Sequence, residues 1–571
     1  MYDVVIRDGL LVDGTGTPPF YGDLAIQGDR ILEVGGKLGA ARTEIKASGR
    51  IVTPGWVDVH SHYDGQATWD PEISPSGTHG VTTTVMGNCG VGFAPVRPKD
   101  HGWLINLMEG VEDIPGTALS EGMSWDWESF PDYLSVLERM PRVMDVATQI
   151  PHAAVRAYVM GVQESIRGTA TPEQLHQMQT IVTEGISAGA LGFSTSRTKL
   201  HLAKDGSAVP GSFVEYEELL RLCHAVKEGG GGVIQLVTDW SKDPAIEFDW
   251  ISRLAKESAQ TVSFTIVQLD EAPGNFRKLL QWTDQAVAAG VPLRPGVGCR
   301  PVGMVISLES ATHPFSEHPS YLGIKDLPLA ERVAVMRDGS FRKRLLGEET
   351  TSKHRFWRPR MSKFDRMFPL TSPPRYEPGP EESIAARARA GGLDPAGLAY
   401  DVLLENDGDG WLYFPFISYS EGDFEALREM MTNDNSVLSL ADGGAHCGFI
   451  SDASAPTFLL THWVKSRDRG EKLPIERAVQ MQTSRTADCW GLEDRGRLAP
   501  GQKADVNVID LDELAIGLPY FANDLPAGGR RLLQDAKGYS YTLASGQITY
   551  VDGKATGARP GRVIRGRRTA H

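Results

Sequence analysis

The feature that most constrains the fold of this chain is an alternation of eight short apolar runs with stretches of helical periodicity. Apolar residues recur at helical spacing in several connections between the runs, for example in residues 173–188 and 216–227. Such an alternation is typical of βα units with a parallel sheet, and eight units close a barrel. The runs are residues 52–59, 80–87, 143–150, 190–195, 232–237, 261–269, 291–298 and 436–441.

Both ends of the chain carry β-like runs of a different kind. In the first 53 residues, short apolar runs are broken by Asp-Gly and Gly-Asp pairs, as in a small antiparallel sheet. Similar short β-like runs occur again near the C-terminus. Two such segments can complete one shared sheet. We therefore predict an α/β chain in three parts. These are a TIM-like (β/α)8 barrel at residues 54–485, a composite β-sandwich of residues 1–53 and 486–571 that ends in a basic tail, and an insertion at residues 299–435, before the last barrel strand.

The predicted insertion is far longer than the loops that usually join such units, and it is rich in Pro, Arg and aromatic residues. We interpret it as a lid or subdomain over the barrel mouth, and an arm for contact between subunits is the alternative. The basic residues after position 554 can mark a nucleic-acid-binding arm, but a solvated or self-docked terminus is the commoner arrangement.

The composition limits the classes of binding partner and the cellular compartment that we expect for this chain. The 571 residues include 58 Lys and Arg against 73 Asp and Glu, a net charge of −15, which disfavours binding to nucleic acid or to an anionic membrane. A small-molecule substrate is the expected partner. The five cysteines are scattered without a Cys-x-x-Cys pair, the N-terminus is acidic, and no run of 18 uncharged apolar residues occurs. We expect a cytoplasmic protein, most simply a homo-oligomer.

Polar and metal-binding residue types collect at the ends of the predicted strands. Active sites of such barrels are built at the C-terminal ends of the strands, so these positions are the candidates for chemistry. They are His60 with His62, Cys89, His152, Ser196 with Arg197, Gln235, Gln268, Arg300 and Asp442.

Three of these strand ends, with four residues between them, predict a metal site. Residues two apart on a strand face the same side, so His60 and His62 can hold one ion together. Cys89 ends the second run among glycines, and its thiolate would bind a divalent cation; a buried inert thiol is the alternative. Asp442 closes the last run, where a carboxylate can bind the metal and take a proton from its water; an Asp-Gly turn is the alternative.

These motifs, taken together, resemble the N-acyl-D-amino-acid deacylase (D-aminoacylase) family of the amidohydrolase superfamily. The resemblance implies a barrel with a β-sandwich, zinc at the barrel mouth and hydrolysis of an N-acyl amide. It assigns His60, His62 and Cys89 to the metal and Asp442 to catalysis. The segments that carry it are residues 51–62, 80–90, 189–196, the region of Asp442, and 495–505.

The sequence departs from the family at two metal ligands. The family has a histidine at the end of the fifth strand and another at the end of the sixth, where this chain has Gln235 and Gln268. An amide oxygen is a poorer zinc ligand than an imidazole, so we expect one Zn²⁺ and a doubtful second site. A rearranged site could recruit His152, His201 or His446.

We therefore predict a metal-dependent amide hydrolase. The ion would lower the pKa of its water to about 7, and Asp442 would act as general base and then as general acid. Arg197 and Arg300 could bind a substrate carboxylate, and either could instead be a structural ion-pair residue. Other candidate substrate contacts are Gln235, Gln268, His152 and His446. A cyclic amide, lactone or carbamate is an alternative substrate, and an inactive barrel that binds a ligand or serves as a scaffold is an alternative function.

Overall fold

The computed structural model describes residues 1–240, 243–352 and 357–566, and at its centre parallel strands form a barrel. Each strand starts inside one of the eight predicted apolar runs and ends within a residue of it, so the predicted barrel is confirmed. The strands are β6 (Trp56–Asp58), β7 (Val81–Met86), β8 (Asp145–Thr148) continued by β9 (Ile150–Pro151), β10 (Gly192–Ser196), β11 (Val233–Val237), β12 (Val262–Thr265), β13 (Leu293–Val297) and β17 (Val437–Leu438).

Backbone hydrogen bonds close the barrel between its first and last strands. The amide of Asp442 donates to the carbonyl oxygen of His60 at 3.0 Å, and the amide of His62 donates to that of Gly443 at 2.8 Å. These bonds lie just beyond the C-terminal ends of β6 and β17. Barrel closure therefore brings the His-x-His pair and Asp442 together, although hundreds of residues separate them in the sequence.

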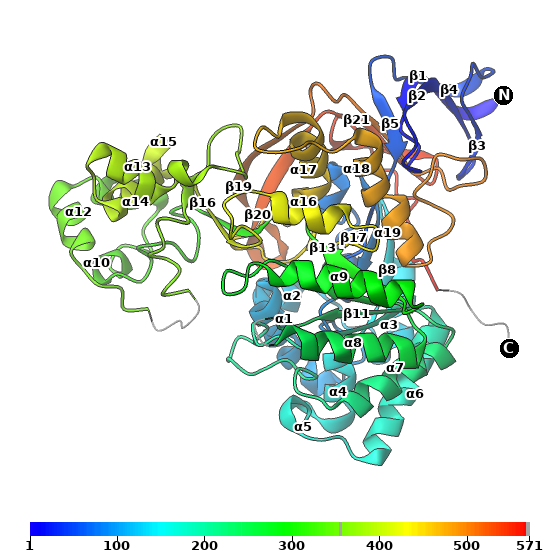
Figure 1. The fold of residues 1–571 in the computed structure, drawn as a ribbon, viewed down its shortest axis with the longest axis horizontal. Helices are drawn as coiled ribbons and strands as arrows, with labels where there is room; N and C mark the ends of the chain where they lie inside the picture. Colours follow the sequence, from blue (N-terminus) through cyan, green and yellow to red (C-terminus); the bar gives the residue numbers. More distant parts are fainter. Residues whose placement is uncertain (241–242, 353–356, 567–571) are drawn as a thin grey trace.

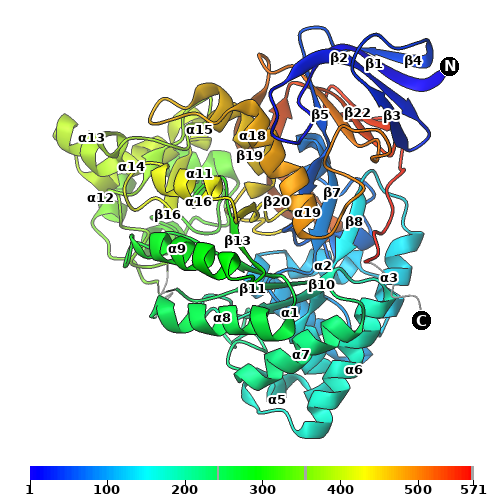
Figure 2. The same ribbon diagram turned by 45° about the vertical axis from the view of Figure 1, so that its right-hand side comes forward.

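The helices outside the barrel follow local sequence signals. Helix α6 (Pro172–Ala188) begins with a capping box, in which the Thr171 side chain accepts from the amide of Gln174 and the Gln174 side chain accepts from the amide of Thr171. Its buried face carries Leu175, Met178, Val182 and Ile186, at the spacing of an amphipathic helix. Figures 1 and 2 show α6, α7 (Tyr216–Glu228), α8 (Pro244–Ser258) and α9 (Asn275–Ala288) in a row on the outer face, each beside the next.

The two ends of the chain share one antiparallel-rich sheet, as predicted. Strand β5 (Ile51–Pro54) pairs with β18 (Val506–Ile509), and this pairing joins the N-terminal strands to the C-terminal ones. The N-terminal strands are β1 (Tyr2–Leu11), β2 (Phe20–Gln27), β3 (Arg30–Val34) and β4 (Ala41–Lys46), and the C-terminal ones are β21 (Tyr539–Ala544), β22 (Gln547–Val551) and β23 (Lys554–Ala555).

The long insertion forms a unit of its own, which projects to one side of the barrel (Figure 1). A three-stranded sheet of β14 (Val302–Ile306), β16 (Leu412–Ile417) and β15 (Phe368–Pro369) forms its base. Helices α10 to α15 pack on a separate hydrophobic core that includes Phe341, Tyr400 and Phe414. The helices are α10 (Pro319–Leu322), α11 (Leu329–Met336), α12 (Gly339–Leu346), α13 (Ile384–Gly391), α14 (Pro395–Leu403) and α15 (Glu405–Gly408).

The insertion proper is shorter than the predicted range of 299–435. Helix α16 (Glu425–Thr432) falls inside that range but packs beside α9 in the helical layer of the barrel, where Arg277 donates to Glu429 at 2.7 Å. The sequence shows that residues 425–432 are amphipathic, but only the tertiary contacts reveal the core against which they pack.

The basic tail docks on the barrel at the N-terminal ends of its strands. The amide of Gly561 donates to the carbonyl oxygen of Arg142 at 2.9 Å, and that of Ile564 donates to Val146 at 2.8 Å. The amide of Arg562 donates to Asp145 at 2.8 Å. The described part of the tail is thus self-docked, whereas Arg567 and Arg568 lie outside the described residues. None of the described helices is long and apolar enough to cross a membrane.

Candidate metal centre

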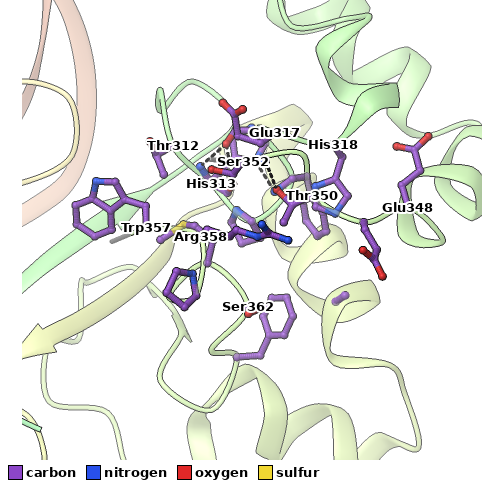
Figure 3. Close-up of a pocket in the computed structure, with 18 of the residues that line it drawn as sticks. Thr312, His313, Glu317, His318, Glu348, Thr350, Ser352, Trp357, Arg358 and Ser362 are labelled. Carbon is purple, nitrogen blue, oxygen red and sulfur yellow. Dashed lines mark hydrogen bonds between the residues drawn. The ribbon is translucent and has the colours of Figure 1, made fainter. Parts of the chain in front are cut away.

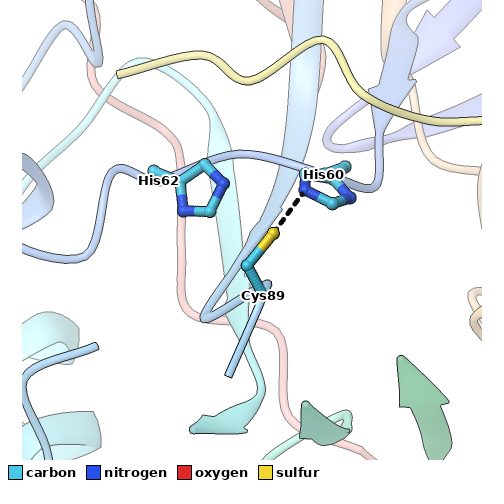
Figure 4. Close-up of side chains that lie close together, drawn as sticks. All are labelled: His60, His62 and Cys89. Carbon is cyan, nitrogen blue, oxygen red and sulfur yellow. Dashed lines mark hydrogen bonds between the residues drawn. The ribbon is translucent and has the colours of Figure 1, made fainter. Parts of the chain in front are cut away.

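Three buried side chains meet at the C-terminal mouth of the barrel. His60 and His62 follow β6, and Cys89 follows β7 (Figure 4). One ligand atom from each of the three lies within 4.8 Å of the other two, and Cys89 Sγ is 3.3 Å from His60 Nε2. Two imidazoles and a thiol are donors that zinc prefers. The structure therefore brings together the three residues whose types and strand-end positions suggested a metal.

Asp442 completes this set with a carboxylate. Its Oδ1 lies 3.3 Å from His60 Nε2 and 3.7 Å from His62 Nε2. Ligand atoms that share a tetrahedral zinc with bonds of about 2.0–2.3 Å stand roughly 3.3–3.7 Å apart. His60, His62 and Cys89 thus fit a single divalent ion by distance and chemistry, and the carboxylate of Asp442 lies at ligand separation from both imidazoles. We refer to His60, His62, Cys89 and Asp442 as the four-residue cluster.

The backbone around the cluster adopts conformations that aim the ligands inward. Cys89 and Asp442 have φ angles of 56° and 45°, in the left-handed region, and each is followed by glycine. A Cβ on Gly90 would lie 2.8 Å from Thr195 Cα, so glycine lets the Cys89 turn approach β10. Ser439 Oγ hydrogen-bonds with His60 Nδ1 at 3.1 Å, which leaves Nε2 to face the cluster.

Burial and neighbouring charge set the protonation of the cluster. Desolvation lowers the pKa of His60 to about 4 and raises that of Cys89 to about 12. Desolvation also opposes charge on His62, but Glu112 and Asp442 hold its pKa well above the usual value. Burial alone would raise the pKa of Asp442, yet the imidazoles hold it below its usual range. In the metal-free chain the cluster thus holds a protonated thiol and a carboxylate.

Glu112, at the end of α1 (His101–Glu112), is a site residue that the sequence analysis missed. Its buried Oε2 lies 3.4 Å from His62 Nε2 and 3.9 Å from His446 Nε2. Glu112 Oε1 has no hydrogen-bond partner in the described part of the chain. The amide of His446 donates to the carbonyl oxygen of Glu112 at 2.5 Å, and that of Gly448 donates to Asp113 at 2.7 Å. No spacing in the sequence marks Glu112, because it comes from a helix rather than from a strand end.

The two strand-end glutamines have different partners. Gln235 Oε1 accepts a hydrogen bond of 2.9 Å from the amide of Cys89, so its side chain lies against the cluster. Gln268 Oε1 accepts from the amide of Ser420 at 3.0 Å, and the amide of Gln268 donates to Ser418 Oγ at 3.2 Å. Gln268 therefore holds the segment that follows β16, while Gln235 holds the Cys89 turn.

The other predicted histidines separate into two groups. His201 hydrogen-bonds with Ser196 at 3.1 Å, and burial, with His62 and His446 nearby, lowers its pKa to about 3. It lies in the electrostatic neighbourhood of the cluster, as His446 does. His152 instead begins α4 (His152–Met160), and its two ring nitrogens bond to Thr195 at 2.9 Å and Glu218 at 3.1 Å. Both polar atoms of His152 are thus used inside the protein.

Both predicted arginines have carboxylate partners within the chain. Arg197 lies 3.3 Å from Glu247 and stacks over Trp250 at 4.3 Å. Arg300 is buried, donates to Asp452 at 2.7 Å, and lies 4.4 Å from the centre of the Tyr376 ring. These contacts correspond to the ion-pair alternative, and a role in binding a substrate carboxylate stays a prediction.

Two cavities adjoin the insertion. One of about 240 Å³ lies at the barrel mouth, between the loops after β10, β11 and β12 and strand β16. A larger one of about 540 Å³ lies inside the insertion, where His313, Glu317 and Trp357 are among its lining residues (Figure 3). None of its lining residues belongs to the cluster. The residues that line the mouth cavity do not belong to the cluster either, because they follow β10, β11 and β12 or lie in the insertion.

Comparison with known proteins gives consistent matches over the whole chain. A family model described as "Amidohydrolase family" matches residues 43–550. D-aminoacylase of Alcaligenes xylosoxydans xylosoxydans is 26% identical over 514 residues, which cover 89% of this chain and 88% of that protein. N-acyl-D-glutamate deacylase of the same organism is 25% identical over 585 residues, covering 99% and 96%.

Solved structures show the same fold. A crystal structure of D-aminoacylase has a TM-score of 0.66 at 22% identity and covers 99% of this chain and 100% of its own. N-acyl-D-glutamate deacylase from Bordetella bronchiseptica, complexed with zinc and a phosphonate inhibitor, has a TM-score of 0.65 at 21% identity, with the same coverage.

Proposed function

Because this chain belongs to the amidohydrolase family, we propose that it hydrolyses the amide bond of an N-acyl-D-amino acid. As a family member it is a metal-dependent hydrolase that acts on carbon–nitrogen bonds other than peptide bonds. The D-aminoacylase and the N-acyl-D-glutamate deacylase, which match along most of their lengths, support the substrate class. The observation that carries the proposal is the convergence of four suitable donors at the barrel mouth.

The cluster is proposed to hold one zinc ion through His60, His62, Cys89 and Asp442. The donor set and its separations fit zinc, and the zinc-bound N-acyl-D-glutamate deacylase supports that metal. When bound, the ion supplies Lewis acidity, which acidifies water and polarises an acyl carbonyl. Gln235 and Gln268 use their amide oxygens in hydrogen bonds to backbone amides, so a second ion on that side has no evident ligands among the described residues.

Asp442 is the group that moves the proton. The nearby imidazoles hold the pKa of its carboxyl low, so it is ionised at neutral pH and can accept a proton. Asp442 takes one proton from water as the oxygen forms a bond to the acyl carbon. It then returns that proton to the departing nitrogen as the carbon–nitrogen bond breaks. The products are a carboxylic acid and a free amino acid, and no electrons are gained or lost.

The compartment and the assembly are also proposals. All five cysteines are unpaired, which supports a reducing compartment such as the cytoplasm. A homo-oligomer is the assembly that we expect, and light scattering coupled to gel filtration tests it. A mass equal to that of one chain, 62.2 kDa, would refute the homo-oligomer.

Metal analysis and a substrate panel test the proposed function. The purified chain should contain about one equivalent of zinc, as expected for four ligands of one ion, and His60→Ala/His62→Ala should contain little. The parent should release acetate from N-acetyl-D-amino acids faster than from their L-enantiomers. Faster hydrolysis of lactones, cyclic amides or carbamates would show that the proposed substrate class is wrong. A chain that binds no zinc would refute the hydrolytic mechanism.

A further inference from the structure

The carboxamide of Gln235 is held at only one of its two ends. Its oxygen accepts the hydrogen bond from the Cys89 amide, but its nitrogen has no hydrogen-bond partner among the described residues. The side chain is nonetheless almost fully buried, with 3% of Gln235 exposed. A buried amide normally uses its two N–H donors as well as its oxygen. These donors are therefore available to a ligand.

The fixed oxygen determines where the donors point. Because Oε1 must face the Cys89 amide, the amide group of Gln235 cannot flip without losing that bond. The backbone of Gln235 pairs in parallel register with Ser194 on one side and Ser263 on the other. Both neighbours are serines, and Ser194 Oγ accepts from the amide of Gly90 at 3.0 Å, so the Cys89 turn packs against this part of the barrel. The nitrogen therefore lies beside the Cys89 turn, in the part of the barrel where the cluster sits.

Several polar groups near the cluster are already occupied, although Glu112 Oε1 and His62 Nδ1 have no partner among the described residues. Ser439 bonds to His60 Nδ1, and Asn88 donates to the carbonyl oxygens of Ser61 and Val85. The side-chain oxygen of Gln268 accepts a hydrogen bond from the amide of Ser420, and its nitrogen lies 3.5 Å from the carbonyl oxygen of Pro273. Gln235 thus offers a pair of free, oriented N–H donors next to the proposed metal ligands.

We propose that Gln235 is a catalytic residue that donates a hydrogen bond to the acyl carbonyl oxygen of the substrate. This inference rests on the proposed amide hydrolysis. As water adds to the carbonyl carbon, negative charge grows on that oxygen, and an N–H donor fixed in advance stabilises the charge. The hydrogen bond transfers no proton, so the products are unchanged. The glutamine then contributes to the reaction as a donor, where a histidine at the same place would contribute as a ligand.

Two substitutions at position 235 separate donation from positioning of Cys89. Gln235→Glu keeps an oxygen for the Cys89 amide but removes the N–H donors, and Gln235→Met removes both. If Gln235 donates to the substrate, both variants should lose about 100-fold in kcat, the usual cost of one such donor. A phosphonate analogue of the N-acetyl-D-amino acid that the parent hydrolyses fastest, which mimics the tetrahedral state, should bind more weakly in proportion to the loss in kcat/KM. Gln174→Glu adds the same charge at the start of α6, where the Gln174 oxygen also accepts from a backbone amide, that of Thr171, and is the matched control, with near-parental values expected.

Metal readouts distinguish this inference from a structural role. In Co²⁺-loaded protein, the thiolate charge-transfer absorption reports whether Cys89 binds the ion. Under the proposal, Gln235→Glu keeps this absorption and one equivalent of metal while it loses activity. Parental activity in Gln235→Glu, or loss of activity together with loss of the absorption, would overturn the inference. A parent chain that hydrolyses no N-acyl amino acid would instead overturn the proposed function.

Discussion

The cluster couples metal binding to protonation at the scale of single residues. In the metal-free chain the thiol of Cys89 is protonated because burial raises its pKa to about 12. Glu112 and Asp442 also raise the pKa of His62 well above its usual value, against the effect of desolvation, and so favour its protonated form. Zinc binds a thiolate and a neutral imidazole, so both protons must leave when the ion binds.

Zinc affinity should therefore rise with pH. Between pH 6.5 and 8 the apparent dissociation constant should fall roughly tenfold per pH unit for each proton released. Calorimetry in buffers of different ionisation enthalpy measures the number of protons. Cys89→Ser should release one proton fewer, because the serine hydroxyl stays protonated. An affinity that does not change with pH would contradict this coupling.

The residues in and around the cluster differ in how far the sequence predicts their place in the site. His60 and His62 follow from the two-residue period of a strand, and Asp442 from its place at the end of the last apolar run. The proximity of Glu112 depends on how α1 packs over the barrel mouth, and the contact between Gln235 and Cys89 depends on which rotamer fills the barrel interior. Such tertiary details leave no periodic signal in the sequence.

At the scale of elements, helix α1 supports the loops around the cluster. Its end holds the His446 loop through the carbonyl oxygen of Glu112. Its last turn also supports the loop that follows His201, because a Cβ on Gly110 would lie 2.3 Å from both Ala203 C and Lys204 N. Glycine at position 110 thus allows direct backbone contact between α1 and this loop.

Gly110→Ala should displace the loop that carries His201. The added methyl group meets backbone atoms, so the substitution should destabilise the protein by about 1–3 kcal/mol and lower kcat/KM. Gly102→Ala in the same helix is the control: a Cβ there has no atom within 4 Å, and alanine should stabilise the helix by roughly 0.5–1 kcal/mol. Thermal unfolding and steady-state kinetics of the two variants measure the difference. Equal effects at the two positions would refute the role of the contact.

The alternation of apolar runs and helices predicts the barrel strands well, because a parallel strand buried on both faces is apolar throughout. The limits of the insertion were predicted less well. Helix α16 has the same amphipathic pattern as the helices of the insertion, and only its contact with α9 places it in the barrel layer. The hairpin of β19 (Ala515–Leu525) and β20 (Gly529–Lys537) also gave no separate signal.

At the scale of the whole molecule, a buried ionic group joins the sandwich to the barrel. Asp145, at the start of β8, accepts from Arg495 at 2.7 Å and also contacts Lys503, and both cations come from the C-terminal part of the chain. Desolvation would raise the pKa of Asp145, but Arg495 and Lys503 hold it below its usual value. The amide of Arg562 in the tail donates to the same carboxylate.

Asp145→Asn should weaken the junction between the sandwich and the barrel. It should also make the stability of the fold less sensitive to acid. A carboxyl with a lowered folded pKa stabilises the fold above its unfolded pKa, about 3.9, and this contribution is lost as pH falls through the folded value. The variant should lose about 3–5 kcal/mol at pH 7, because two buried cations lose a partner. The free energy of unfolding of the variant should also depend less on pH below pH 4. Denaturant titrations at several pH values measure both effects.

Asp494→Asn is the control for the Asp145 junction. Asp494 pairs with the same Arg495 at 3.0 Å, but its side chain is 43% exposed, so the loss should stay within about 1 kcal/mol. A loss at Asp145 no larger than that at Asp494 would contradict the proposed importance of the junction.

The sheet shared by both ends has a consequence for the order in which the chain can fold. The indole of Trp56 donates to the hydroxyl of Tyr539, which lies 483 residues later. Strands β1 to β5 therefore leave the ribosome long before β18, and the edge of β5 lacks its β18 partner until hundreds of further residues have been made. Contacts between such distant segments slow folding, and an unpaired strand edge can bind other chains in the meantime. Chaperone demand during synthesis should thus be concentrated on the first 54 residues.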